Sequence, residues 1–316
     1  MSCLALAVCL IWLATQQPWL GLHLAIDRAG NVAIERVAAA GPLPKTVSGG
    51  LTGARLLAVV PETARALNTP QALLIEPNDL IEEPDTLGSP ALMRRFYARQ
   101  DEIVTALRGG PVTLMFERGG VREMVTVQAA ATRPLADLPV KLWQQLFVAL
   151  TGALVGAWVV CLRPRDGAAW MMLVAGAGLA MASASAALYS AREIALSAPL
   201  FTFASRVNNC GALIFGIGMV TLFLIYPRRI VPRAVLWLPL GVISGCIAFL
   251  QLGNWPQHVG LLQDMIAAIM VVLLVAIIAQ VIVNRRDPRA RAMLGWLGMS
   301  IGVGAGGFVL TSVVPA

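Results

Sequence analysis

Long apolar runs separated by short polar stretches dominate the pattern of hydrophobic and polar positions in this chain. Most of these runs hold close to the ~20 residues that a helix needs to cross ~30 Å of hydrocarbon. Only helices and closed barrels satisfy their backbone polar groups in lipid, and runs this long and apolar are typical of helices. The pattern predicts seven membrane-spanning helices, near residues 4–15, 140–162, 168–189, 207–226, 234–252, 265–283 and 292–314.

Arginines are concentrated in alternate short loops between these runs. Nine of them lie in three loops, at residues 163–166, 227–233 and 285–291. The two loops that alternate with these hold only Arg192. Because arginine is retained on the cytoplasmic side of a membrane, the sequence predicts a cytoplasmic amino terminus. Residues 18–139 and the last residue, Ala316, are then expected outside.

Composition agrees with a membrane protein, because 58% of the residues are hydrophobic. The net charge of +7 comes with arginines beside the apolar runs, so topology and contacts with membrane lipids explain it and no nucleic acid is expected. The five cysteines lie in or beside the apolar runs, and no disulfide framework, metal site or cofactor is predicted.

Residues 18–133 have a different pattern, that of an α+β domain. An amphipathic helix is expected over 91–108, because apolar residues recur there near helical spacing and Gly109-Gly110 follows as a stop. The apolar positions of that helix are Leu92, Phe96, Ile103, Val104 and Leu107. Alternating apolar residues and turn signals predict strands at 22–26, 32–37, 55–60, 73–75, 112–118 and 121–127.

The end of this domain resembles a bacterial PDZ domain. Its helix is followed by a Gly-Gly-Pro break and then, at 112–120, by Val-Thr-Leu-Met-Phe-Glu-Arg-Gly-Gly. Leu20-Gly21-Leu22 is similar to the loop with which that family binds a peptide carboxylate. The middle departs from the pattern, because Ala54 stands where the family has an aspartate and the proline-containing stretch 61–90 is longer than usual.

The resemblance implies that Leu20, Gly21 and Leu22 offer backbone amides to a carboxylate. It also implies that strand 22–26 pairs with an added peptide strand. The alternative is that the domain's own insertion fills this groove, or that the membrane hides it.

A second resemblance covers most of the chain. Residues 223–233 read Phe-Leu-Ile-Tyr-Pro-Arg-Arg-Ile-Val-Pro-Arg, and 286–302 begin with Arg-Asp-Pro. Together with a first helix and a PDZ-like domain, these segments resemble the sensor region of bacterial histidine kinases of the competence quorum-sensing type. The resemblance implies a first transmembrane helix at 1–17, an extracytoplasmic PDZ-like domain at 18–133 and a six-helix transmembrane bundle at 134–316, in the inner membrane.

The departure from those kinases concerns catalysis. They continue into a phosphoacceptor helix bundle and an ATP-binding domain, and this sequence shows no nucleotide-binding motif. Its two histidines, His23 and His258, fall in regions expected outside. We therefore expect a sensing region without catalytic activity. Its expected partners are an extracytoplasmic peptide or apolar ligand, a second copy in a homodimer, or a separate cytoplasmic kinase.

One polar cluster lies at the outer end of the fourth run, where polar residues are costly in lipid and commonly face a partner or a cavity. It consists of Arg206, Asn208 and Asn209, and Asp264 opens the sixth run at the same level and is placed to pair with Arg206. The cluster forms an outward-facing ligand pocket on one interpretation. On the other, Arg206 reaches the headgroups and the asparagines make helix–helix hydrogen bonds.

Other membrane functions are less well supported by the residues. A zinc protease of the membrane needs His-Glu-x-x-His, which is absent, and a membrane serine protease needs a histidine within a span. A small-molecule or lipid transporter, or an accessory membrane subunit, remains the alternative function, although no inverted repeat is visible. A peptide-binding PDZ membrane partner is the other alternative.

Overall fold

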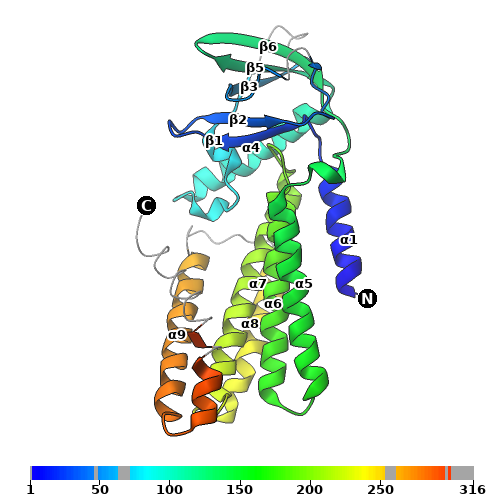
Figure 1. Ribbon diagram of the computed structural model, residues 1–316. Helices are drawn as coiled ribbons and strands as arrows, with labels where there is room; N and C mark the ends of the chain where they lie inside the picture. Colours follow the sequence, from blue (N-terminus) through cyan, green and yellow to red (C-terminus); the bar gives the residue numbers. More distant parts are fainter. Residues whose placement is uncertain (1, 46–48, 63–71, 253–260, 296–297, 300–316) are drawn as a thin grey trace. The chain divides into compact units, whose positions relative to one another are not determined.

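The computed structural model describes residues 2–45, 49–62, 72–252, 261–295 and 298–299 (Figure 1). The chain divides into two compact units. The sheet unit comprises residues 1–144 and 186–204, and the helical unit comprises residues 145–185 and 205–316. Residues 186–204 therefore group with the sheet, although the sequence predicted them to belong to the transmembrane bundle.

The sheet unit contains an antiparallel sheet of six strands, in the order β1-β2-β3-β5-β6 with β4 paired to β3 (Figure 1). Its strands are β1 Leu22–Ile26, β2 Val32–Val37, β3 Arg55–Pro61, β4 Leu73–Leu74, β5 Pro111–Arg118 and β6 Val121–Gln128. All six expected strands are confirmed, with ends that differ by one residue at most. Trp19 also pairs with Ala130, which joins the segment before β1 to the segment after β6.

The hairpin of β5 and β6 shows why local sequence predicted the sheet well. Gly119 and Gly120 have φ values of +57° and +82°. Two successive left-handed residues form the tight turn whose twist suits a two-residue hairpin, and glycine adopts them without steric cost. The strands then pair without a register shift from Pro111 opposite Gln128 to Arg118 opposite Val121.

Helix α4, Pro90–Arg108, packs on the sheet (Figure 1). The hydroxyl of Ser89 accepts a hydrogen bond from the N–H of Leu92, and Pro90 occupies the first turn, both of which favour helix initiation. The prediction that Leu92 lies on the apolar face was wrong. Its side chain is exposed and Met93 is buried instead, because the face runs through Met93, Phe96, Gln100, Ile103, Val104 and Leu107.

Short 3-10 helices complete the sheet unit: η1 Pro77–Leu80, η2 Pro84–Thr86 and η3 Leu135–Asp137. The first is fixed to α4 by a two-point ion pair, in which Arg99 donates to both carboxylate oxygens of Asp79 at 2.8 and 2.6 Å. Asp79 is 1% exposed, and this buried pairing raises the pKa of Arg99. Helix α1, Ser2–Thr15, belongs to the same unit.

The remaining helices are α5 Val140–Leu162, α6 Gly167–Ser190, α7 Ala198–Ile225, η4 Arg233–Trp237, α8 Leu238–Leu252 and α9 Leu261–Val283. Glycines bring α6 and α7 close together within the helical unit. A Cβ added to Gly178 would lie 2.3 Å from the backbone N of Phe215 and 2.7 Å from the carbonyl oxygen of Gly211. Small residues permit this close approach, as they do in membrane helix pairs generally.

Four of the described helices are long and apolar enough to cross a membrane, over Val140–Leu162, Gly167–Ser190, Ala198–Ile225 and Gln263–Val283. The chain is therefore a multi-pass membrane protein with one antiparallel sheet. The prediction of seven spans exceeds this number. Helices α1 and α8 have 14 and 15 residues. At ~1.5 Å per residue their lengths are about 21–23 Å, which is shorter than the ~30 Å hydrocarbon thickness of a bilayer. The run 292–314 lies largely outside the described residues, as does His258.

Candidate carboxylate site in the sheet unit

The segment Leu20-Gly21-Leu22, which we call the amide loop, holds the carboxylate of Glu193. The N–H of Leu20 donates to Oε2 of Glu193 at 2.6 Å, and the N–H of Leu22 donates to Oε1. Gly21 has a φ of +81°, and a Cβ there would lie 2.9 Å from the Cα of Gly41. Glycine therefore sets the shape of the loop. The resemblance to PDZ domains implied a peptide carboxylate at this loop, and in the structure a side-chain carboxylate of the chain itself lies there.

Glu193 belongs to a segment that joins two membrane helices. Residues 191–197, the connecting segment, follow α6 and precede α7. Three further hydrogen bonds fix this segment and the start of α7 within the sheet unit. Arg133 donates to the carbonyl of Ala191 at 2.7 Å, the N–H of Leu196 donates to Oε1 of Gln100 at 3.1 Å, and the N–H of Ala198 donates to Asp101 at 3.2 Å.

Arg192 anchors the start of the connecting segment. Its guanidinium donates to the carbonyl oxygens of Tyr189 and Ile81, and lies 4.8 Å from the centre of the Phe201 ring. A cation over an aromatic face is attracted by the ring quadrupole. Burial lowers the pKa of Arg192 to about 10, so the side chain stays charged at neutral pH.

Apolar burial adds to these polar contacts. Ile194 and Ala195 belong to the core cluster of the sheet unit, and Ile194 and Leu196 are at most 1% exposed. The cluster includes Leu20 and Leu22 at the start of β1, together with residues of α4. Full burial of an aliphatic side chain contributes about 1.5–3 kcal/mol, so the connecting segment is packed as tightly as the domain core.

A buried charged cluster centred on Asp137 lies beside the amide loop. Its carboxylate accepts hydrogen bonds from Trp19 Nε1 at 2.8 Å and Arg133 Nε at 3.2 Å, and its Oδ1 lies 2.8 Å from His23 Nε2. Arg133 is 6% exposed and also bonds Ala191. This cluster therefore ties the strand region, the segment after β6 and the connecting segment together.

The carboxyl group of Glu193 has a raised pKa. Burial raises its pKa from 4.5 to about 7, against the opposing effects of the Leu20 and Leu22 amides and of Arg133, while the charge of Asp137 adds to the increase. Desolvation disfavours a charged carboxylate, and here it outweighs the two amide hydrogen bonds. The docked side chain therefore titrates near neutral pH.

An open pocket of about 520 Å³ lies beside β1. All five residues of β1 line it, and so does Glu193. Since β1 is an edge strand of the sheet, its outer side is the one available for a further strand. The charged or titratable side chains of the pocket are His23, Glu35, Glu82, Arg133, Lys141, Arg192 and Glu193.

The other predicted site residues lie in the helical unit and do not form part of this pocket. Asn208 donates to the carbonyl of Ala182 at 2.9 Å, Asn209 is buried, and Asp264 is exposed in the first turn of α9. An ion pair of Arg206 with Asp264 is not seen among the described residues. The bond of Asn208 is a helix–helix hydrogen bond of the kind expected, and the ligand pocket stays a prediction.

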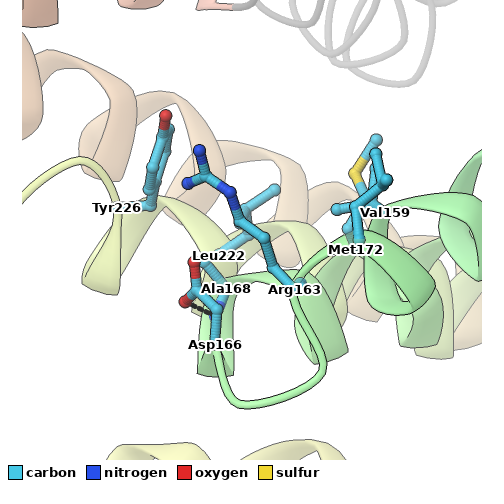
Figure 2. Close-up of a pocket in the computed structure, with 9 residues that line it drawn as sticks. Val159, Arg163, Asp166, Ala168, Met172, Leu222 and Tyr226 are labelled. Carbon is cyan, nitrogen blue, oxygen red and sulfur yellow. Dashed lines mark hydrogen bonds between the residues drawn. The ribbon is translucent and has the colours of Figure 1, made fainter.

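A second pocket, of about 320 Å³, lies at one end of α5, α6 and α7 (Figure 2). Figure 2 shows Arg163, Asp166 and Tyr226 among mostly apolar neighbours, with Asp166 bonded to the N–H of Ala168 at 2.9 Å. Its polar lining consists of Arg163, Asp166 and Tyr226. No group of three side chains suited to a metal occurs in the described part of the chain.

Glu193 was missed at the sequence level, although the amide loop was found. The signal available was that Arg192 and Glu193 are the only charged residues of loop 190–200. No local motif marks Glu193 as a ligand of the amide loop. Among the described residues the connecting segment occupies the amide loop. Leu80 and Glu82 of the stretch 61–90 line the pocket beside β1, and filling of the groove by that stretch stays a prediction.

Comparison with known proteins gives no family: no family model, curated protein or solved structure matches this sequence.

Proposed function

We propose that this chain is the membrane-embedded input region of a two-component-type sensor in a bacterial inner membrane, with the sheet domain as its extracytoplasmic receptor. The observation that carries this proposal is the docking of the connecting segment. Residues 191–197 join two membrane helices directly, and Glu193, Leu196 and Ala198 all bond to the sheet domain. Any event that changes the sheet domain at this place acts on the ends of α6 and α7.

The arginine pattern and this docking support the same topology. The positive-inside bias puts residues 18–139 and loop 190–200 on one side of the membrane. Docking of the connecting segment on the sheet domain requires both to be on one side. A seven-span arrangement, with the amino terminus inside and residues 18–139 outside, satisfies both observations.

The PDZ-like interpretation of the sheet domain is supported by how the amide loop is used. In the resembled family, such a loop receives a carboxylate through backbone amides, and Leu20 and Leu22 do so here with Glu193. The helix α4 and an edge strand are present as the resemblance implies. In this proposal the chain itself performs no catalysis and needs no cofactor, and its output passes to a cytoplasmic kinase.

The proposal is tested by asking whether the docking contact reaches the opposite ends of the helices. The full chain is placed in lipid nanodiscs, and hydrogen exchange is followed by mass spectrometry in loops 163–166 and 227–233. We expect Glu193→Ala to change exchange in these loops at least twofold. Glu35→Ala, which removes another carboxylate of the same pocket, is the matched control and should leave them unchanged. Changes confined to residues 18–139 and 186–204 would contradict a sensory role.

A further inference from the structure

The connecting segment contacts the sheet domain as a ligand does. It supplies a carboxylate to two convergent backbone amides, and the next side chain, Ile194, is 1% exposed within the core cluster. A carboxylate held by two backbone amides is also the group that the end of a peptide chain offers. Here a glutamate side chain provides the carboxylate, so no free chain end is required.

The carboxylate site is also connected to the open pocket. Glu193 lines the pocket of about 520 Å³ that runs along β1, and Arg133 and Arg192 contribute positive charge to the same lining. A second carboxylate therefore has a route to the amide loop from the side where Glu193 now lies. It has no place to bind there while Glu193 occupies both amides.

We propose that residues 191–197 are an internal ligand that keeps the amide loop blocked, and that an external peptide carboxylate binds there only by displacing Glu193. This inference rests on the proposed function and specifies its regulation, because displacement would free the segment that joins α6 and α7. The sensor would then be held in its resting arrangement by its own chain, and its signal would be a competing carboxylate.

Glu193 is the residue whose removal separates the blocked from the open form. Glu193→Ala removes the competing carboxylate and leaves the amides of Leu20 and Leu22, which belong to the backbone. The remaining contacts of Arg192 and Leu196 are unchanged, so the variant tests the carboxylate and not the whole segment. Glu35→Ala is the matched control, because it removes a carboxylate of the same pocket that does not contact the amides.

The experiment measures binding of a short fluorescein-labelled peptide that ends in isoleucine, by fluorescence anisotropy, to the full chain in nanodiscs. We expect Glu193→Ala to bind the free-acid peptide at least about tenfold more tightly than the natural chain or Glu35→Ala does. The same peptide with an amidated end should bind at least tenfold more weakly than the free acid. Equal binding by the natural chain and Glu193→Ala, or equal binding of the two peptides, overturns the proposal.

Hydrogen exchange in residues 191–197 of the natural chain is a second test, which does not depend on correct folding of the variant. We expect the free-acid peptide to increase exchange of this segment in the natural chain at saturating concentration, and the amidated peptide to leave it unchanged. Peptide binding without release of the segment overturns the displacement. Failure here is distinguishable from failure of the sensory role, because that role is judged by loops 163–166 and 227–233 and not by peptide binding.

Discussion

The two units bury polar groups of different kinds. In the sheet unit the buried contacts of the connecting segment include charged side chains beside the neutral Gln100, with Glu193 on the amide loop and Arg133 on Asp137 and Ala191. In the described part of the helical unit the fully buried polar side chains, Thr221 and Gln280, are neutral. Gln280, which is 0% exposed, donates to the carbonyls of Phe223 and Arg228 at 2.6 and 2.7 Å.

This difference indicates which contacts of the molecule are able to change with pH or with a competing ligand. A neutral amide that satisfies the carbonyls at the end of a helix keeps the same hydrogen bonds at any pH. A buried carboxylate changes its charge near its pKa, and another carboxylate competes for the same amides. We infer that the helical unit is held by contacts that do not respond to solution conditions, and that the docking of the connecting segment does respond.

The largest effect is expected from filling the contact between α6 and α7. Gly178→Ala places a Cβ 2.3 Å from a backbone atom of Phe215, so the helices must separate, at a cost of about 1–3 kcal/mol. The control Gly245→Ala lies where nothing is within 4 Å and should be neutral or stabilising. Thermal unfolding in detergent measures both. Equal melting temperatures for the two variants would contradict close packing at Gly178.

A second substitution tests the neutral contacts of the helical unit. Gln280→Leu leaves the carbonyls of Phe223 and Arg228 without their side-chain donor, and we expect a loss of about 1–3 kcal/mol in unfolding free energy. Gln263→Leu, the same change in the first turn of α9, is the control and should cost far less. A loss that varies with pH between 5 and 8 would contradict the distinction between the two units.

The third prediction is the pH dependence of docking. The docked pKa of about 7 exceeds the ordinary value of 4.5, so the docked form binds more protons than the released form between these values. Docking is therefore strongest below about pH 4.5 and weakens as pH rises through about 7. Nearby groups that titrate or carry charge are His23, Glu35, Glu82, Arg133, Asp137, Lys141 and Arg192.

Peptide binding reports this dependence. We expect the natural chain to bind the free-acid peptide more tightly as pH rises from 5 to 8, while Glu193→Ala changes little. The advantage of the variant should therefore shrink with pH. An advantage that grows with pH would mean that the charged form of Glu193 docks better, contrary to the burial argument.

The smallest effect is expected at the rim of the pocket. Lys141 and Glu82 form an exposed ion pair at 2.8 Å, and such pairs contribute less than about 1 kcal/mol. Lys141→Ala should leave both peptide binding and the exchange of residues 191–197 within twofold of the natural chain. A larger change would show that rim charge, and not the carboxylate of Glu193, controls docking.

Sequence reasoning succeeded where the determining contacts are local. Alternation and paired glycines predicted β5 and β6, and helical spacing of apolar residues with the Gly109-Gly110 stop predicted α4 to within a residue at its start. The predicted apolar face of α4 was wrong at Leu92, which is exposed, whereas its neighbour Met93 is buried. Hydrophobicity alone does not show which of two adjacent apolar residues faces the core.

The contact of Glu193 with Leu20 was beyond sequence reasoning because it joins residues 173 positions apart. No periodicity links a strand edge to a loop between distant helices. The amide loop was identified through the resemblance of Leu20-Gly21-Leu22 to the carboxylate-binding loop of PDZ domains. Apolar composition marks a run without fixing how many of its residues the helix includes, as α8 shows, and four of the predicted runs form helices of spanning length among the described residues.

Accessibility of the connecting segment tests the central claim most directly. Ala195 is 5% exposed, whereas Ala29 in the turn between β1 and β2 is exposed. Ala195→Cys and Ala29→Cys are compared in intact membranes by the rate of alkylation with a membrane-impermeant reagent, resolved by peptide mass spectrometry. Docking predicts that position 195 reacts at least about tenfold more slowly than position 29, and that adding Glu193→Ala reduces this protection. Equal rates at the two positions in the otherwise natural chain would contradict docking of residues 191–197 on the sheet domain.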